Sequence, residues 1–269
     1  MFPYKRIALP DAVPLAYVDE GTGPLIVMLH GFTGTAHRHF SRMISEYSTD
    51  HRVVVPDFRG YGASRPPLRD FPPNFIERDA DDVAYLMDHL RSPQAIVFGF
   101  SDGGESALIL AARRPDLVRA LVVWGTVGQA SPGDLEFFAQ LPPVDNWGPD
   151  LAPWRESIIE HHGKEQWPHL ITARAEVARL MVATRWNASL QHAQLIKCPV
   201  LQIHGEIEER KCRAQVSQLA SAIHDCHVEI LLGGDHSLQL ENPEELSLLI
   251  RPFIKRIDAS REKGGLTIR

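Results

Sequence analysis

Short apolar runs alternate with longer amphipathic stretches along most of the chain. Helical patterns with a 3.6-residue period occur at about 37–47, 77–90, 103–113, 212–222 and 243–256. The apolar runs between them are short enough for strands and lie at residues 16–19, 25–29, 52–55, 95–98, 120–123, 200–203 and 228–231. Alternation of strand and helix predicts an α/β fold, with a mostly parallel central sheet flanked by helices. The first two runs flank a Gly- and Pro-rich turn and predict an antiparallel pair.

This alternation breaks down over residues 127–190. Proline and glycine cluster at 142–153, helical patterns follow, and the segment holds Trp147, Trp154, Trp167 and Trp186. An aromatic-rich insertion between two strands is typical of a cover over a binding pocket. We therefore expect residues 1–126 and 191–269 to form the core and residues 127–190 to form a helical cap inserted between two strands. A set of ordinary surface helices is the alternative.

The sequence Gly99-Phe-Ser101-Asp-Gly103 lies between the apolar run at 95–98 and a helical pattern. A G-x-S-x-G motif between a strand and a helix is the nucleophile elbow of serine hydrolases. We expect Ser101 to have a positive φ that projects its hydroxyl above the sheet, with the two glycines leaving room for the sharp turn. Ser101 is therefore the candidate nucleophile.

A serine hydroxyl is a weak nucleophile and needs a base, for which His236 is the candidate. This histidine follows the apolar run at 228–231, so it would lie at the carboxyl edge of the sheet, where the active sites of parallel sheets form. It also comes last in the order nucleophile, acid, base.

The acid that orients the histidine is predicted in the segment 204–210, HGEIEER, which follows another apolar run. Hydrolases with this motif order usually carry G-x-x-D here, and counting from Gly205 puts Glu208 in the position of the aspartate. A glutamate can take this role if the backbone retracts slightly to accommodate the extra methylene. Glu206 and Glu209 are rival candidates, and a run of solvated charges is the simplest alternative.

Two backbone N–H groups are needed to bind the oxyanion of a tetrahedral intermediate. One would come from Asp102, directly after the nucleophile. The other would come from Phe32 in the segment 30–34, HGFTG, which follows the apolar run at 25–29. Residues 57–64 are also Gly-rich, but they lack the Gly-Lys-Ser/Thr of a phosphate-binding loop and are interpreted as scaffold.

Composition narrows the possible partners. The 28 basic and 34 acidic residues give a net charge of -6, which argues against nucleic acid because phosphate binding needs a basic face. No apolar run reaches the ~20 residues of a membrane helix, and the start lacks the apolar stretch of a signal peptide. Three cysteines without a close pair predict thiols in a reducing compartment. We expect a soluble cytoplasmic monomer that acts on a small molecule without cofactor or metal, and we expect His161-His162 to be solvated.

The segments HGFTGT, DFRGYGAS, GFSDGG and GGDH, in this order, resemble the α/β-hydrolase superfamily over most of the chain. Residues 59–82, GFSDGG and VVWGT at 122–126 more specifically resemble the biphenyl hydrolase-like (valacyclovirase-like) proteins, which are α-amino acid ester hydrolases. The resemblance implies an α/β-hydrolase fold and the triad Ser101, Glu208 and His236. The family has an aspartate where this chain has Glu208, and residues 127–190 match poorly.

The resemblance also implies a second role for Asp102. In the valacyclovirase-like group an aspartate after the nucleophile binds the α-ammonium of the substrate, whereas esterases commonly have an apolar residue there. A carboxylate beside the nucleophile opposes the oxyanion unless a cation neutralises it, and an α-ammonium lies close enough to the scissile carbonyl to do so. Capping of the helix N-terminus is the alternative interpretation.

Hydrolysis of carboxylic esters through an acyl-enzyme is the predicted function, with α-amino acid esters as the implied substrates. Carbon–carbon bond hydrolysis of ring-cleavage products ranks lower, because Asp102 would repel their anionic dienoates. The alternative that is not an enzyme is a ligand-binding protein with an impaired triad. The only feature that suggests it is the glutamate at position 208.

Overall fold

A computed structural model of the chain describes residues 2–92, 94–130 and 132–264. Its eight-stranded sheet has the spatial order β1-β2-β4-β3-β5-β6-β7-β8. The pairs β1-β2 and β2-β4 are antiparallel and the remaining pairs are parallel, which confirms the predicted α/β class. The strands are β1 (Tyr4–Ala8), β2 (Pro14–Glu20), β3 (Leu25–Leu29), β4 (Arg52–Pro56), β5 (Ala95–Phe100), β6 (Val118–Trp124), β7 (Val200–Gly205) and β8 (Cys226–Leu231).

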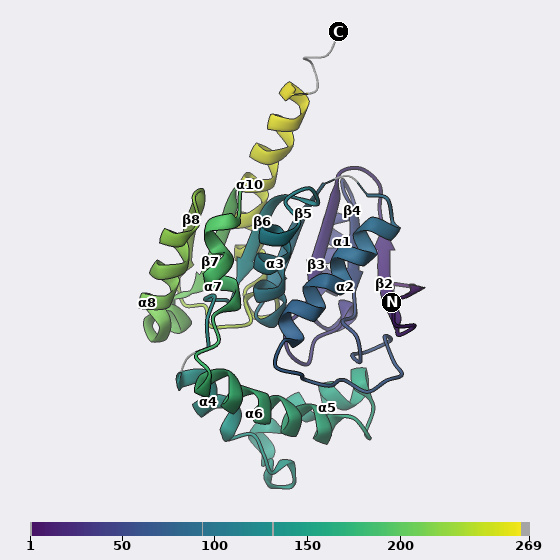
Figure 1. Cartoon of the computed structure of the whole chain (residues 1–269), viewed down its shortest axis with the longest axis vertical. Helices are drawn as coiled ribbons and strands as arrows, with labels where there is room; N and C mark the ends of the chain where they lie inside the picture. Colours follow the sequence, from purple (N-terminus) through teal and green to yellow (C-terminus); the bar gives the residue numbers. More distant parts are fainter. Residues whose placement is uncertain (1, 93, 131, 265–269) are drawn as a thin grey trace.

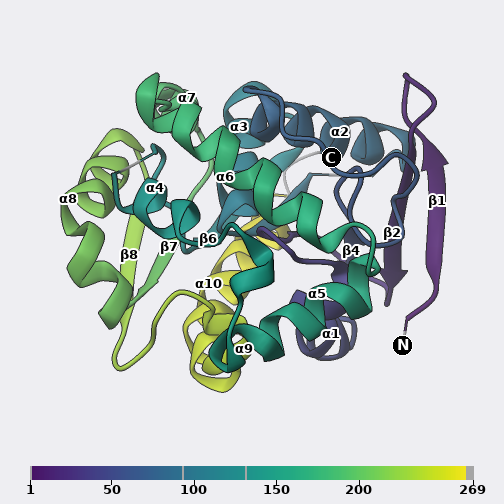
Figure 2. The same cartoon turned by 90° about the horizontal axis from the view of Figure 1, so that it is seen from below.

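Helices cover both faces of the sheet (Figures 1 and 2). Figure 2 shows α2 (Phe75–His89) and α3 (Asp102–Arg113) on one side, with α1 (Ala36–Tyr47), α9 (Leu238–Glu241) and α10 (Pro243–Gly264) on the other. Helix α8 (Glu206–Ala222) lies against the β7–β8 edge. The segment between β6 and β7 forms α4 (Pro132–Ala139), α5 (Ala152–His162), α6 (Trp167–Ala183) and α7 (Ala188–His192).

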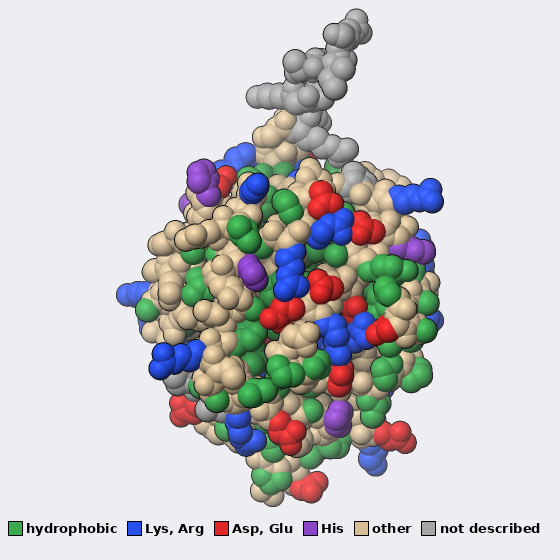
Figure 3. Space-filling model, viewed as in Figure 1, with side chains coloured by type: hydrophobic (Ala, Val, Ile, Leu, Met, Phe, Trp, Pro, Cys, Tyr) green, Lys and Arg blue, Asp and Glu red, His purple; other side chains and the backbone are tan. Residues whose placement is uncertain are grey.

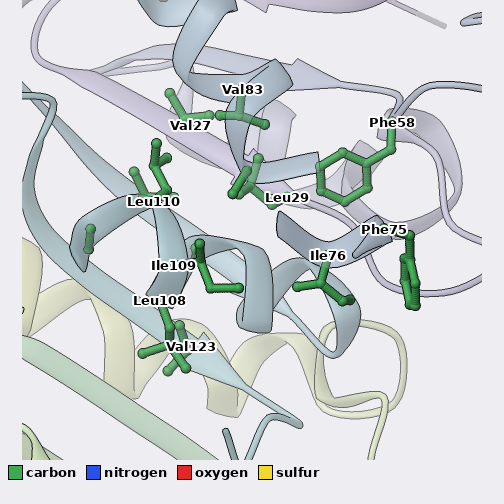
Figure 4. Close-up of a cluster of buried hydrophobic side chains, with 14 of the residues drawn as sticks. Val27, Leu29, Phe58, Phe75, Ile76, Val83, Leu108, Ile109, Leu110 and Val123 are labelled. Atoms are coloured by element: carbon green, nitrogen blue, oxygen red, sulfur yellow. The ribbon is translucent and has the colours of Figure 1, made fainter. Parts of the chain in front are cut away.

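The period-two alternation of side chains along each strand divides the core into two clusters. On β3, Val27 and Leu29 belong to the cluster under α2 and α3, which Figure 4 shows with Val83 and Leu110. Their neighbours Ile26 and Met28 point to the opposite face and pack in the cluster under α1 and α10. A strand that is buried on both faces must be apolar throughout, which explains the continuous apolar runs in the sequence.

Two details of the predicted secondary structure are wrong. The runs at 16–19 and 25–29 do not pair, because β4 lies between them, antiparallel to β2 and parallel to β3. Their connection is therefore not a hairpin turn. Helix α8 begins at Glu206 rather than at 212, and its backbone is kinked at Cys212. The charged first turn of α8 shows no apolar periodicity, so it resembles a loop in the sequence.

Helices α4, α5 and α6, here called the cover helices, lie together across one end of the sheet (Figures 1 and 2). Trp154 and His162 of α5 both bond to Thr33 in the loop after β3, and Arg174 of α6 bonds to the first residue of α3. The cover helices therefore meet the carboxyl edge of the sheet. The division into a core and a cap domain stays a prediction.

Acidic and basic side chains are mixed over the face displayed in Figure 3. In the part of the chain that the structure describes, no helix has both the length and the apolar character needed to cross a membrane.

Candidate active site

Ser101 occupies a strained turn between β5 and α3. Its φ of 55° and ψ of -123° lie in the region that residues with a side chain rarely adopt, as expected for an elbow. A Cβ on Gly103 would lie 2.2 Å from the carbonyl oxygen of Leu29, and one on Gly99 would lie 2.6 Å from the carbonyl oxygen of Gly103. Both glycines of the motif are therefore required by close backbone packing around the serine.

His236 lies beside this turn, on the loop that follows β8. Its ring is tilted against Phe100, the residue before the serine, with 5.0 Å between centroids. It also lies against Gly125, where a Cβ would come within 2.9 Å of the His236 Cε1. The imidazole and the elbow thus meet at the carboxyl edge of the sheet, which is where their positions after β8 and β5 predict them.

Glu208 is the carboxylate that contacts this histidine. Its Oε1 lies 2.5 Å from Nδ1 of His236. Because Nδ1 must carry the proton in this hydrogen bond, Nε2 of the neutral ring is left as an acceptor. The rivals are engaged elsewhere: Glu206 pairs with Arg210, and Glu209 lies 2.6 Å from Arg213.

The electrostatics of the pair favour a charged glutamate and a basic histidine. Burial acts to raise the pKa of Glu208, but hydrogen bonds from His204 and His236 outweigh it and lower the pKa to about 2. The side chain of His236 is 46% exposed. Its partial burial acts to lower its pKa, but the hydrogen bond and the charge of Glu208 outweigh this effect and raise that pKa. Glu208 therefore stays ionised at neutral pH and stabilises an imidazolium.

The two predicted oxyanion donors are the backbone N–H groups of Phe32 and Asp102. Among the hydrogen bonds of residues 2–92, 94–130 and 132–264, none is donated by the backbone N–H of Phe32 or Asp102. A Cβ on Gly31 would lie 2.8 Å from the Ser101 Cβ, so the loop that carries Phe32 passes close to the serine. These amides are available to a negatively charged oxygen.

Residues of α5 hold the Phe32 loop in this position. His162 Nε2 donates to the carbonyl of Thr33 at 2.9 Å, and its Nδ1 accepts from the N–H of Gly62 at 3.1 Å. Trp154 Nε1 donates to the Thr33 hydroxyl at 3.1 Å. The expectation that His161-His162 is solvated is therefore wrong for His162, which is fully buried because both of its ring nitrogens are satisfied by backbone groups.

Asp102 has a partner that the sequence analysis missed. Arg174 of α6 binds both of its carboxylate oxygens, with Nη2–Oδ1 at 3.0 Å and Nε–Oδ2 at 3.3 Å. The guanidinium also lies 4.0 Å from the centre of the Phe138 ring, a cation–π distance. The available signal was an arginine on the apolar face of a helix, one turn after Leu170 and one turn before Ala178. Such a charge needs a buried partner.

His204 is the second residue that sequence reasoning passed over. It is fully buried in β7 and lies 3.2 Å, through Nδ1, from the Oε2 of Glu208. Glu208 therefore contacts two histidines, one through each carboxylate oxygen.

Comparison with known proteins shows which fold and which relatives the chain resembles. The family model described as the alpha/beta hydrolase fold matches residues 24–164. The mouse (Mus musculus) protein "Serine hydrolase BPHL" is 30% identical over 251 residues, covering 91% of this chain and 84% of its own length. The "2-(acetamidomethylene)succinate hydrolase" of Mesorhizobium japonicum is 34% identical over 259 residues, covering 88% of this chain and 90% of its own length.

A solved structure supports the fold. The crystal structure of an E-2-(acetamidomethylene)succinate hydrolase superposes with a TM-score of 0.77 at 23% identity, covering 95% of this chain and 100% of that chain.

Proposed function

The chain belongs to the α/β-hydrolase family, and from that premise we propose that it hydrolyses carboxylic esters through an acyl-enzyme formed on Ser101. The observation that carries the proposal is the 2.5 Å bond between Glu208 and His236, formed beside a serine held at a positive φ. A nucleophile, a base and an acid that orients the base are the three groups that this chemistry requires.

The proposed reaction gives each of these groups one role. The Ser101 oxygen attacks the ester carbonyl and passes its proton to Nε2 of His236, while the N–H groups of Phe32 and Asp102 bind the oxyanion. His236 then protonates the departing alcohol, which leaves the acyl group on the serine. A water molecule gives a proton to His236, attacks the acyl carbon, and releases the carboxylic acid as the serine regains its proton.

For the acyl group, we propose α-amino acid esters. The support is the Asp102 carboxylate, which adjoins the nucleophile and has a side chain only 14% exposed, together with the resemblance of GFSDGG to the valacyclovirase-like group. Because Arg174 already pairs with Asp102, an α-ammonium must displace the guanidinium to bind there. The ion pair neutralises Asp102 until the substrate's own cation replaces Arg174.

One observation favours a second candidate, a substrate whose acyl part carries a carboxylate. Arg174 brings a cation to the site, and the Mesorhizobium japonicum relative is named for a succinate. Ring-cleavage dienoates for carbon–carbon hydrolysis belong to the same anionic class. The argument that Asp102 repels them is weaker once Arg174 neutralises that carboxylate.

A panel of esters compared by kcat/KM at one pH tests the substrate class. Amino acid esters, their N-acylated counterparts, succinate half-esters and simple acetates separate the candidates. Loss of activity on N-acylation supports the ammonium role. A higher kcat/KM for succinate half-esters, or for a phenyl-dienoate, than for the amino acid esters would favour the anionic substrates instead. Activity on simple acetates alone contradicts both.

A further inference from the structure

His204 forms a hydrogen-bonded chain behind Glu208 in the interior of the protein. Gln202 and His204 both belong to β7 and are fully buried. The Nε2 of His204 lies 3.0 Å from the amide nitrogen of Gln202, and its Nδ1 lies 3.2 Å from Oε2 of Glu208. The chain thus runs from Gln202 through His204 and Glu208 to His236.

The partners of the Gln202 amide determine which nitrogen of His204 carries the proton. The amide nitrogen of Gln202 also lies 3.4 Å from the carbonyl of Thr126, to which it donates. The amide oxygen faces the Sγ of Cys226 at 3.8 Å. An amide NH₂ can only donate, so His204 Nε2 accepts, and the proton of a neutral ring resides on Nδ1, which donates to Glu208.

We propose, building on the proposed function, that His204 is a positioning residue that holds Glu208 in the orientation needed by His236. A glutamate side chain has one more rotatable bond than an aspartate and loses more conformational freedom when it is fixed. Glu208 belongs to the first turn of α8, and its contact with His236 alone would leave the carboxylate free to turn. A second donor on Oε2 directs Oε1 at His236, which is how supporting hydrogen bonds orient catalytic groups.

Other charged residues near His236 and Glu208 also influence how this pair takes up a proton. Asp235 on the same loop and Asp102 of α3 act on His236 besides Glu208. Glu206 and Glu209 of α8 are paired with arginines. Removing the His204 donor lets the Glu208 carboxylate turn away from His236, so the imidazolium loses part of its stabilisation and forms only at a lower pH.

The rate at which a fluorophosphonate labels Ser101, measured from about pH 5 to about pH 9, tests this role. We expect His204→Phe to lower the plateau rate about tenfold or more and to move the midpoint downward, toward that of Glu208→Gln. His204→Asn retains an N–H donor near the Nδ1 position and should recover most of the rate. In a Glu208→Gln background, His204→Phe should have little further effect because the two residues act as a unit.

Labelling of the wild type separates the two proposals. If folded wild-type protein is not labelled, the proposed function fails; if it is labelled and His204→Phe matches its rate and midpoint, the role of His204 fails. A measurement on the wild-type protein tests the role of His204 even if His204→Phe does not fold. Nitrogen-15 NMR of the wild-type imidazoles should show the neutral His204 ring with its proton on Nδ1, and an Nε2–H tautomer would overturn the inference.

Discussion

The Oε1 of Glu208 lies 2.5 Å from the Nδ1 of His236, although 28 positions separate the two residues in the chain. One belongs to the first turn of α8 and the other to the loop after β8. Since β7 and β8 are adjacent and parallel, the segments that follow them emerge at the same edge of the sheet. This adjacency allows a residue that follows β7 to contact a residue that follows β8.

Replacing Glu208 by glutamine should remove the charge that stabilises the imidazolium. We expect kcat to fall on the order of 10³-fold in Glu208→Gln. Glu206→Gln and Glu209→Gln are matched controls in the same helical turn and should stay close to the wild-type rate, because their carboxylates pair with arginines. A loss in either control as large as that in Glu208→Gln would contradict the assignment of the acid.

The pH dependence of kcat/KM should report the raised pKa of His236. An imidazolium cannot accept the proton of Ser101, so activity is lost as the pH falls through that pKa, which lies above the ordinary value for a histidine. Glu208, with a pKa of about 2, remains ionised throughout this range. In Glu208→Gln the midpoint should move down, since the carboxylate that raises the pKa is gone. An upward shift or no shift would refute this explanation.

The elbow should tolerate no side chain at Gly103. Gly103→Ala would force a Cβ to within 2.2 Å of the backbone at Leu29, and we expect the free energy of unfolding to fall by about 2 kcal/mol or more. Gly148→Ala is the matched control because, apart from its chain neighbours, no heavy atom of the described residues lies within 4 Å of the added Cβ, and it should change stability by less than about 0.5 kcal/mol. Denaturant unfolding compares them; equal stabilities would contradict the predicted clash.

Arg174→Met tests which charge the substrate brings. If α-ammonium groups compete with Arg174 for Asp102, this variant should hydrolyse amino acid esters with a higher kcat/KM, while Asp102→Ala should lower it far more for amino acid esters than for p-nitrophenyl acetate. If Arg174 binds an acyl carboxylate instead, Arg174→Met should lose activity on succinate half-esters. Asp102→Ala losses that are equal on both esters would count against the ammonium role.

The sequence predicts those parts of the site that depend on the conformation of the local backbone. The glycines around Ser101 are there because the turn excludes side chains, so the motif indicates the geometry directly. Spacing from Gly205 favours Glu208 but leaves Glu206 and Glu209 as rivals. The contact with His236 depends on where the first turn of α8 begins, and that turn has no apolar pattern in the sequence.

Contacts between residues that are far apart in the sequence are harder to predict. Arg174 and Asp102 are 72 positions apart, and nothing local in either segment indicates the other. His162 carries no signal of its burial, because the backbone groups that satisfy it come from Thr33 and Gly62, far away in the sequence. The predicted antiparallel pairing of the first two apolar runs is wrong for a related reason, because β4, from later in the chain, lies between them.

Intact-mass analysis after treatment with a fluorophosphonate tests the central claim most directly. Folded wild-type protein should gain one adduct, located on Ser101 by peptide mapping, and Ser101→Ala should gain none. Absence of an adduct on the folded wild-type chain, or an equal adduct on Ser101→Ala, would contradict an activated serine at this site.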